Sequence, residues 1–110
     1  MAIFITQGRF TPEAIKGMIA SPEDRADTVA KLFAKSGGKL LSYFMTFGEY
    51  DFMVVSEGPY EAMAVTAIVV AAGGGVIDLK TTLALSSAEM KQAFTNAAPI
   101  AATFRSAGAK

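Results

Sequence analysis

Residues 46–55 read TFGEYDFMVV and place a turn between two runs of strand-forming residues. The flanking segments, 39–47 and 52–57, carry apolar residues on both sides of their alternation, which predicts a hairpin covered on both faces. We expect Gly48 to supply a positive φ at the corner, and Tyr50 and Asp51 to fasten it. Two alternatives stay open: Asp51 as a general base beside Tyr50 as a donor to a substrate oxygen, or an interface role for the turn.

The segment before this hairpin begins with strand formers and continues with helix signals. Residues 2–8 are rich in β-branched and aromatic side chains, which predicts a strand. Thr11-Pro12 and Ser21-Pro22 are both typical of helix starts, and Gly37-Gly38 is typical of a helix end. We therefore expect one broken helical connection between the first strand and the hairpin.

The segment after the hairpin repeats the order of helix and strand. Residues 60–72 follow a proline and carry no charge after Glu61, which predicts a helix buried on more than one side. The glycines at 73–75 follow this helix and precede a strand at 76–85. A phosphate-binding loop runs from strand to helix, so we interpret these glycines as a helix stop.

The predicted order of elements defines a fold class. Strand, helix, strand, strand, helix, strand is the order of the ferredoxin-like α+β fold, a four-stranded antiparallel sheet with both helices on one face. We assign residues 1–85 to this domain. Residues 86–110 form a helix from Ser86 and an alanine-rich tail from Pro99, which we expect to pack on the domain or on a neighbouring subunit.

Composition excludes several classes of chemistry. The 110 residues include ten basic and ten acidic side chains, so no net charge attracts nucleic acid or an anionic membrane, and we expect neither partner. The chain has no cysteine and no histidine, and we find no metal-ligand spacing, so we expect no metal and no cofactor. The first residues lack the features of a signal peptide, which predicts a cytoplasmic protein.

The hydrophobic fraction is high for so short a chain, at 52%. One small core hides only part of this surface, and the glycine triplet interrupts the longest uncharged run, which argues against a membrane span. We therefore expect a homodimer or a higher homo-oligomer, whose interface resembles a core cut in half.

The motif GEYD lies between two predicted strands, preceded by AKLFAKSGGKL and followed by FMVVSEGP. This arrangement resembles the GYD-domain family of small bacterial and archaeal proteins. The resemblance covers roughly residues 2–90. It implies a subunit of the dimeric α+β barrel type, in which two sheets pack open face to open face. The wider superfamily includes cofactor-independent monooxygenases, haem-dependent enzymes and ligand-sensing domains, so the resemblance implies little about activity.

Alternation along the strands suggests one ligand site on the open face of the sheet. A mostly apolar cavity with a few polar groups is typical of such sites. The candidate ligand-binding residues are Phe4, Thr6, Phe44, Thr46, Asp78 and Lys80. An alternative leaves Asp78 and Lys80 as a solvated strand edge, and a slip of one residue exchanges the two faces.

Two functions of different classes follow from these observations. The first is a small homo-oligomeric protein that assembles or binds a small apolar ligand without catalysis, and we favour it. The alternative is a cofactor-independent monooxygenase or isomerase acting on a small aromatic or quinone-like compound. Its candidate catalytic residues are Asp51, Tyr50 and Lys80, because carboxylate, phenol and amine are the titratable groups available.

Overall fold

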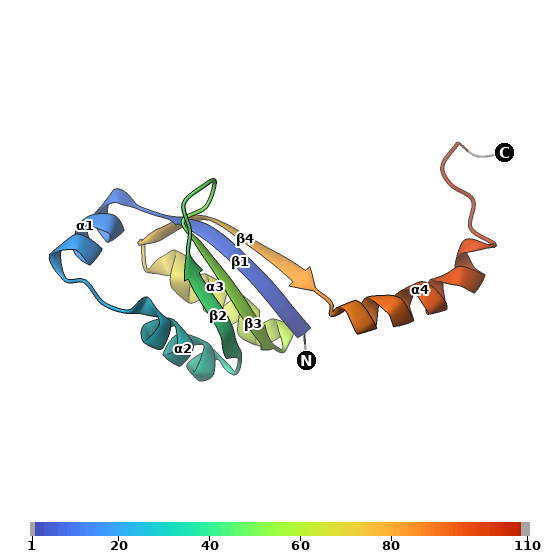
Figure 1. The fold of residues 1–110 in the computed structure, drawn as a ribbon, viewed down its shortest axis with the longest axis horizontal. Coiled ribbons are helices and arrows are strands. Elements are labelled where there is room, and N and C mark those ends of the chain that lie inside the picture. Colours follow the sequence, from blue (N-terminus) through green and yellow to red (C-terminus); the bar gives the residue numbers. More distant parts are fainter. Residues whose placement is uncertain (1, 109–110) are drawn as a thin grey trace.

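The computed structural model describes residues 2–108 and contains one four-stranded sheet and four helices (Figure 1). The elements follow in the order β1 (Ala2–Phe10), α1 (Pro12–Ala20), α2 (Arg25–Ser36), β2 (Lys39–Met45), β3 (Phe52–Gly58), α3 (Tyr60–Ala72), β4 (Val76–Ala84) and α4 (Ser87–Ala101). With α1 and α2 as one broken connection, this order confirms the ferredoxin-like α+β fold predicted from the sequence.

The sheet is antiparallel throughout, with the strand order β2-β3-β1-β4. Register and burial together assign its two faces. Phe4 and Thr6 of β1 are both buried, so they lie on the face that the helices cover. Ile5 lies between them in sequence, opposite Val55 of β3 and Thr82 of β4, and therefore belongs to the other face.

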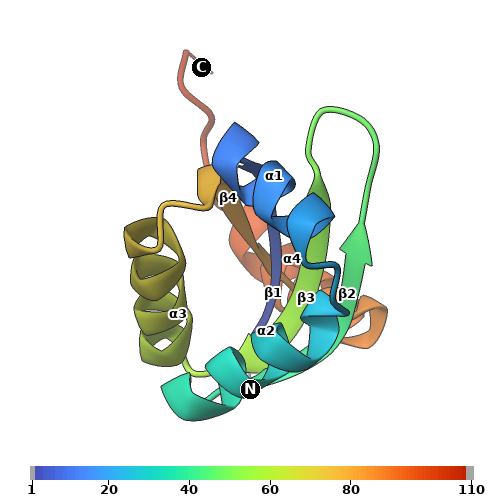
Figure 2. The same ribbon diagram turned by 90° about the vertical axis from the view of Figure 1, so that its left-hand side faces the viewer.

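Helices α2 and α3 cover the first of these faces (Figure 2). The buried cluster under them joins Phe33 of α2 and Met63 of α3 to strand residues Phe4, Phe52 and Val54. Burial of such side chains contributes about 1.5–3 kcal/mol each to the stability of the fold. Within the described part of the chain, no element covers the opposite face, which we call the open face.

The junction of α2 and β2 depends on its two glycines. Gly37 ends α2 in the left-handed region, with φ 95°, as its sequence predicts. A Cβ on Gly38 would lie 3.1 Å from the backbone oxygen of Glu57. A side chain at Gly38 would therefore crowd the close approach of the β2 and β3 backbones at this junction.

The last helix projects away from the domain (Figure 1). A capping box of Ser86 and Glu89 starts α4, and every residue from Leu85 to Gly108 is exposed. The helix continues through Pro99 to Ala101, so the expectation that the tail begins at Pro99 is wrong. The radius of gyration is 18.1 Å, whereas a compact chain of this length has about 13 Å. Residues 109 and 110 of the predicted tail lie outside the described residues.

Candidate functional site

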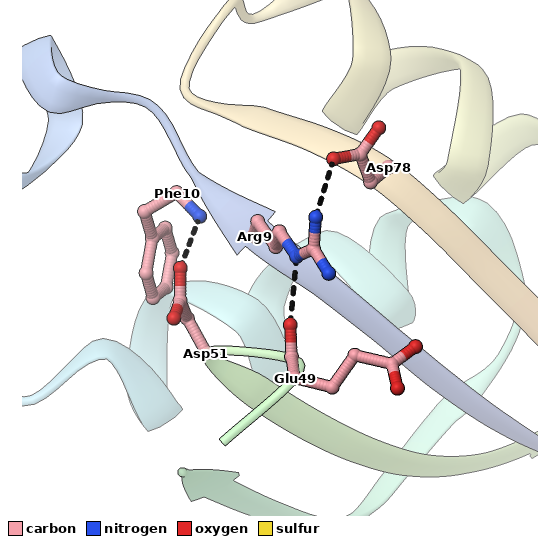
Figure 3. A network of polar contacts seen from close by, with 5 residues as sticks. All are labelled: Arg9, Phe10, Glu49, Asp51 and Asp78. Carbon is pink, nitrogen blue, oxygen red and sulfur yellow. Dashed lines mark hydrogen bonds and ion pairs between the residues drawn. The ribbon is translucent and has the colours of Figure 1, made fainter. Parts of the chain in front are cut away.

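The turn between β2 and β3 is tied to the end of β1 by Asp51 (Figure 3). Its carboxylate accepts a hydrogen bond from the backbone N–H of Phe10 at 2.9 Å. Its own N–H donates to the oxygen of Gly8 at 2.8 Å, and its carbonyl oxygen accepts from Thr46 N at 2.8 Å. Asp51 thus uses its side chain and its backbone to hold three segments together.

Arg9 adds a second set of contacts to the same corner (Figure 3). Its Nε donates to the backbone oxygen of Glu49 at 2.7 Å, and its guanidinium carbon lies 5.6 Å from the centre of the Tyr50 ring. Its Nη1 is 3.3 Å from Asp78 Oδ2. Asp78 has φ 55°, where the register of β1 and β4 shifts between Gln7 and Arg9. Aspartate tolerates this left-handed conformation better than most residues.

Gly48 has a different role from the one its sequence context suggests. It is not among the residues with positive φ, and a Cβ there would meet nothing within 4 Å. The expectation that Gly48 supplies a left-handed corner is therefore wrong. The turn from Thr46 to Asp51 is long enough to reverse the chain without it, and side chains supply the order: Thr46 Oγ1 donates to Tyr50 O at 2.7 Å.

The three catalytic candidates do not converge. Asp51 and Tyr50 lie in the turn and are engaged by Phe10 N and Arg9. Lys80 lies on β4, opposite Gln7 and on the open face. Among residues 2–108, no polar contact joins Lys80 to Asp51 or to Tyr50. The contacts of Asp51 and Tyr50 hold the turn against the end of β1.

The structure separates the six ligand candidates into three groups. Phe4 and Thr6 lie under the helices, at 6% and 7% exposure, so the expectation that they face the open side is wrong. Phe44, opposite Met53, lies on the open face with Lys80. Asp78 pairs with Arg9, and Thr46 belongs to the turn. The physical reason is the register: the alternation of β1 is the reverse of the one assumed.

A cavity that the sequence did not predict lies on the helix side of the sheet. Its volume is about 120 Å³. It is lined from α2, α3 and all four strands, and residues that define its walls are Arg25, Val29, Tyr43, Phe52, Ala67 and Val70. Tyr43 stacks on Phe52, with 6.5 Å between ring centres. A sequence signal existed in Tyr43, an aromatic residue with a polar tip on a strand expected to be covered on both faces.

The titration of Tyr43 reflects this position. Burial raises the pKa of the Tyr43 phenol, and the nearby positive charge of Arg25 opposes that increase. The phenol is therefore a neutral hydrogen-bond donor over the whole physiological pH range. Its hydroxyl lies 3.4 Å from Met45 Sδ.

A second, more polar hollow lies beside α1. Its volume is about 330 Å³, and Ala14, Gly17, Ser21, Glu23 and Arg25 are part of its lining. Among residues 2–108, no group of three acidic side chains is placed to hold a metal ion. In the same range, no helix has the length and apolar character needed to cross a membrane.

Three solved structures with a similar fold are distant from this chain in sequence. TTHA0845 from Thermus thermophilus is 16% identical with a TM-score of 0.50, covering 79% of this chain and 96% of that one. The transcriptional regulator NMB0573 from Neisseria meningitidis, solved with L-Met, is 14% identical with a TM-score of 0.50. That match covers 78% of this chain and 51% of the regulator. FFRP-DM1 is 15% identical with a TM-score of 0.46, covering 77% of this chain and all of its own.

These likenesses concern the fold alone, because sequence identity is low. No curated protein matches the chain. The family profile is the informative comparison, since the GYD domain matches residues 4–94 and so includes the sheet, helices α1 to α3 and the first half of α4. The resemblance of the turn and the glycine junction is confirmed: the chain belongs to the GYD domain family.

Proposed function

We propose that this protein is a non-catalytic, self-assembling subunit, in which two copies pair through the open faces of their sheets. The single observation that carries the proposal is the character of that face. Its centre is mostly apolar, with Gln7, Ser42 and Thr82 as its polar positions, and its margins carry both charges. The central residues are Ile3, Ile5, Phe44, Met53 and Val55, and the marginal ones are Arg9, Lys39, Glu57 and Lys80.

An apolar centre with a polar rim is the usual anatomy of a protein interface. The Phe44 side chain is 55% exposed although it lies on a strand of the sheet. A large exposed aromatic side chain among other apolar residues is typical of a surface that another protein covers. Pairing two identical faces about a two-fold axis would bury each Phe44 against the partner sheet. The opposite charges of Lys39 and Glu57, which face each other on β2 and β3, would lie at the rim.

The total exposed surface supports assembly independently. The chain exposes 7723 Å², whereas a compact monomer of 11.5 kDa exposes about 5,800 Å². The excess of about 1,900 Å² is more than the roughly 800 Å² that each partner buries in a standard interface. Much of it belongs to α4 and the tail, which contact little of their own domain.

We extend the proposal to α4, which would pack on a second copy. Met90 and Phe94 are four residues apart on one side of α4, and Phe94 is 71% exposed. Helix α3 offers a matching surface, because Val65, Ile68 and Val69 point outward from the domain. A helix that is apolar all round is normally buried on several sides, which α3 alone does not achieve.

Catalysis is not part of this proposal. Neither of the two cavities described above is lined by Asp51, Tyr50 or Lys80. A general base must lie within hydrogen-bond reach of its substrate, and the Asp51 carboxylate is already engaged by a backbone N–H. The monooxygenase or isomerase alternative has no observation in its favour.

Two phenylalanines of the same hairpin provide a matched test. Phe44→Asp places a charge on the open face, so it should separate copies that pair through this face and lower the sedimentation coefficient. Phe47→Asp changes a fully exposed side chain in the turn, at 105% exposure, and should leave the assembly intact. Sedimentation velocity at micromolar concentration separates the two. Equal sedimentation coefficients for both variants and the wild type would contradict pairing through this face.

A further inference from the structure

The cavity under α2 and α3 has walls that suit an apolar guest. Two threonine hydroxyls among the lining residues are already satisfied within the protein. Thr66 Oγ1 donates to Ala62 O at 2.9 Å, and the hydroxyls of Thr6 and Thr81 bond each other at 3.2 Å. In residues 2–108, no buried side-chain nitrogen or oxygen lacks a partner. The deep part of the cavity therefore offers contact surface and no polar recognition.

The size of the cavity limits what can enter. An engineered apolar cavity of about 150 Å³ stays dry and binds benzene, so the present 120 Å³ matches a single ring or a branched aliphatic group. Unfilled apolar volume destabilises a core in proportion to its size. Filling this volume with a guest removes that penalty.

The mouth of the cavity is where polar groups gather. Thr28 is exposed, and the Arg25 side chain is 37% exposed, so the opening lies at the first turn of α2. The guanidinium of Arg25 is paired with Glu23, at 2.6 Å from Nη1 to Oε1, so this ion pair adds no net charge to the rim. A carboxylate guest would have to compete with Glu23 for Arg25.

Tyr43 provides one hydrogen-bond donor at this cavity. Its hydroxyl lies against Met45 Sδ at 3.4 Å, and a thioether is a weak acceptor. Exchanging that sulfur for an oxygen of a guest would strengthen the hydrogen bond. Burial keeps the phenol protonated, as its raised pKa indicates, so the donor is present at every physiological pH.

We infer that this cavity is a binding site for an uncharged small molecule with one apolar ring and one hydrogen-bond-accepting oxygen. The ring lies between Phe52, Ala67 and Val70, and the oxygen accepts from Tyr43 near the mouth. Every lining residue comes from one chain, so the site is complete without the assembly proposed above. A ligand screen and the assembly test can therefore fail separately.

The test measures Tm of the full chain with three probes at millimolar concentration: benzene, acetophenone and benzoate. A ligand that binds only the folded state raises Tm by mass action. We expect a rise with benzene, a larger rise with acetophenone, and the smallest with benzoate. No rise with any probe would overturn the inference, and a larger rise with benzoate than with acetophenone would overturn its uncharged character.

Variants locate the site. Ala67→Leu fills the cavity from α3 and should abolish the acetophenone shift, whereas Ala14→Leu, in the hollow beside α1, should retain it. Tyr43→Phe keeps the ring on Phe52 but removes the hydroxyl. We expect this variant to bind acetophenone about fivefold more weakly, which corresponds to the loss of one hydrogen bond. Its affinity for benzene should be unchanged. An acetophenone shift that survives Ala67→Leu, or equal affinity in Tyr43→Phe, would contradict the site.

If Ala67→Leu does not fold, the position of the bound ligand can be measured directly in the wild-type protein. Nuclear Overhauser effects from the acetophenone ring to the methyl groups of Ala67 and Val70 are expected in the wild-type protein. Effects to Ala14 and Met18 instead would place the guest beside α1 and refute the assignment. Absence of effects to Ala67 and Val70 would refute it equally.

Discussion

The carboxylate of Asp51 accepts the backbone N–H of Phe10 at 2.9 Å, and this bond joins residues 41 positions apart. It closes the end of β1 onto the turn between β2 and β3. The N–H of Phe10 would otherwise be an unpaired donor in a partly buried position, which is costly. The Asp51 side chain in the turn therefore ties the end of β1 to the hairpin.

The Asp51 bond predicts a measurable loss of stability. We expect Asp51→Ala to lower the free energy of unfolding by about 1–2 kcal/mol, because a hydrogen bond to a charged group is lost and a donor is left unpaired. Glu49→Ala is the control, since only the backbone oxygen of Glu49 is used in the corner. Urea denaturation measures both. Equal stability of the two variants would mean that Asp51 does not fasten the corner.

Much of the fold was predictable because local signals agree with the tertiary structure. Thr11-Pro12, Gly37 and the glycine triplet mark helix ends that the structure confirms. A strand followed by a turn and a second strand left few alternatives to a hairpin. The assignment of sheet faces failed for Phe4 and Thr6, because a shift of one residue exchanges the faces and no single strand fixes it.

Glycine substitutions distinguish the two turns of the domain. Gly37→Ala should lower the free energy of unfolding by about 1 kcal/mol, because alanine resists the left-handed conformation at φ 95°. Gly48→Ala should change it by less than about 0.5 kcal/mol, since that position is open and not left-handed. Chemical denaturation of the pair is the measurement. A larger effect at Gly48 would show that the turn requires a conformation the structure does not contain.

The candidate site was harder to predict than the fold. The cavity under α2 and α3 is formed by residues from six elements, and its shape depends on the distance between helices and sheet. No spacing in the sequence encodes that distance. Arg25 and Tyr43 are 18 positions apart and meet at one cavity only because α2 lies across β2 and β3.

The start of α4 should respond to acid. Its capping box lowers the pKa of Glu89 below 4.5, first through the backbone hydrogen bond from Ser86. A carboxylate with a lowered pKa in the folded state stabilises that state above its ordinary pKa, and the stabilisation is lost as pH falls through the lowered value. We expect the first turn of α4 to fray in that range.

Amide chemical shifts of residues 87–91 follow the fraying directly. Glu89→Gln retains the shape of the side chain and removes its titration, so its α4 shifts should not change over the same pH range. A pH dependence shared by the wild type and Glu89→Gln would assign the transition to another group. If the amide shifts of the wild type do not change with pH, the Glu89 carboxylate does not stabilise the first turn of α4.

The mass of the protein in solution tests the proposed self-assembly most directly. Size-exclusion chromatography with light scattering at micromolar concentration should give at least twice the chain mass of 11.5 kDa. In the proposed assembly, a second copy covers the open sheet face, the outward side chains of α3 and the projecting α4. A folded, monodisperse species of 11.5 kDa, with the circular dichroism of an α+β protein, would contradict the account.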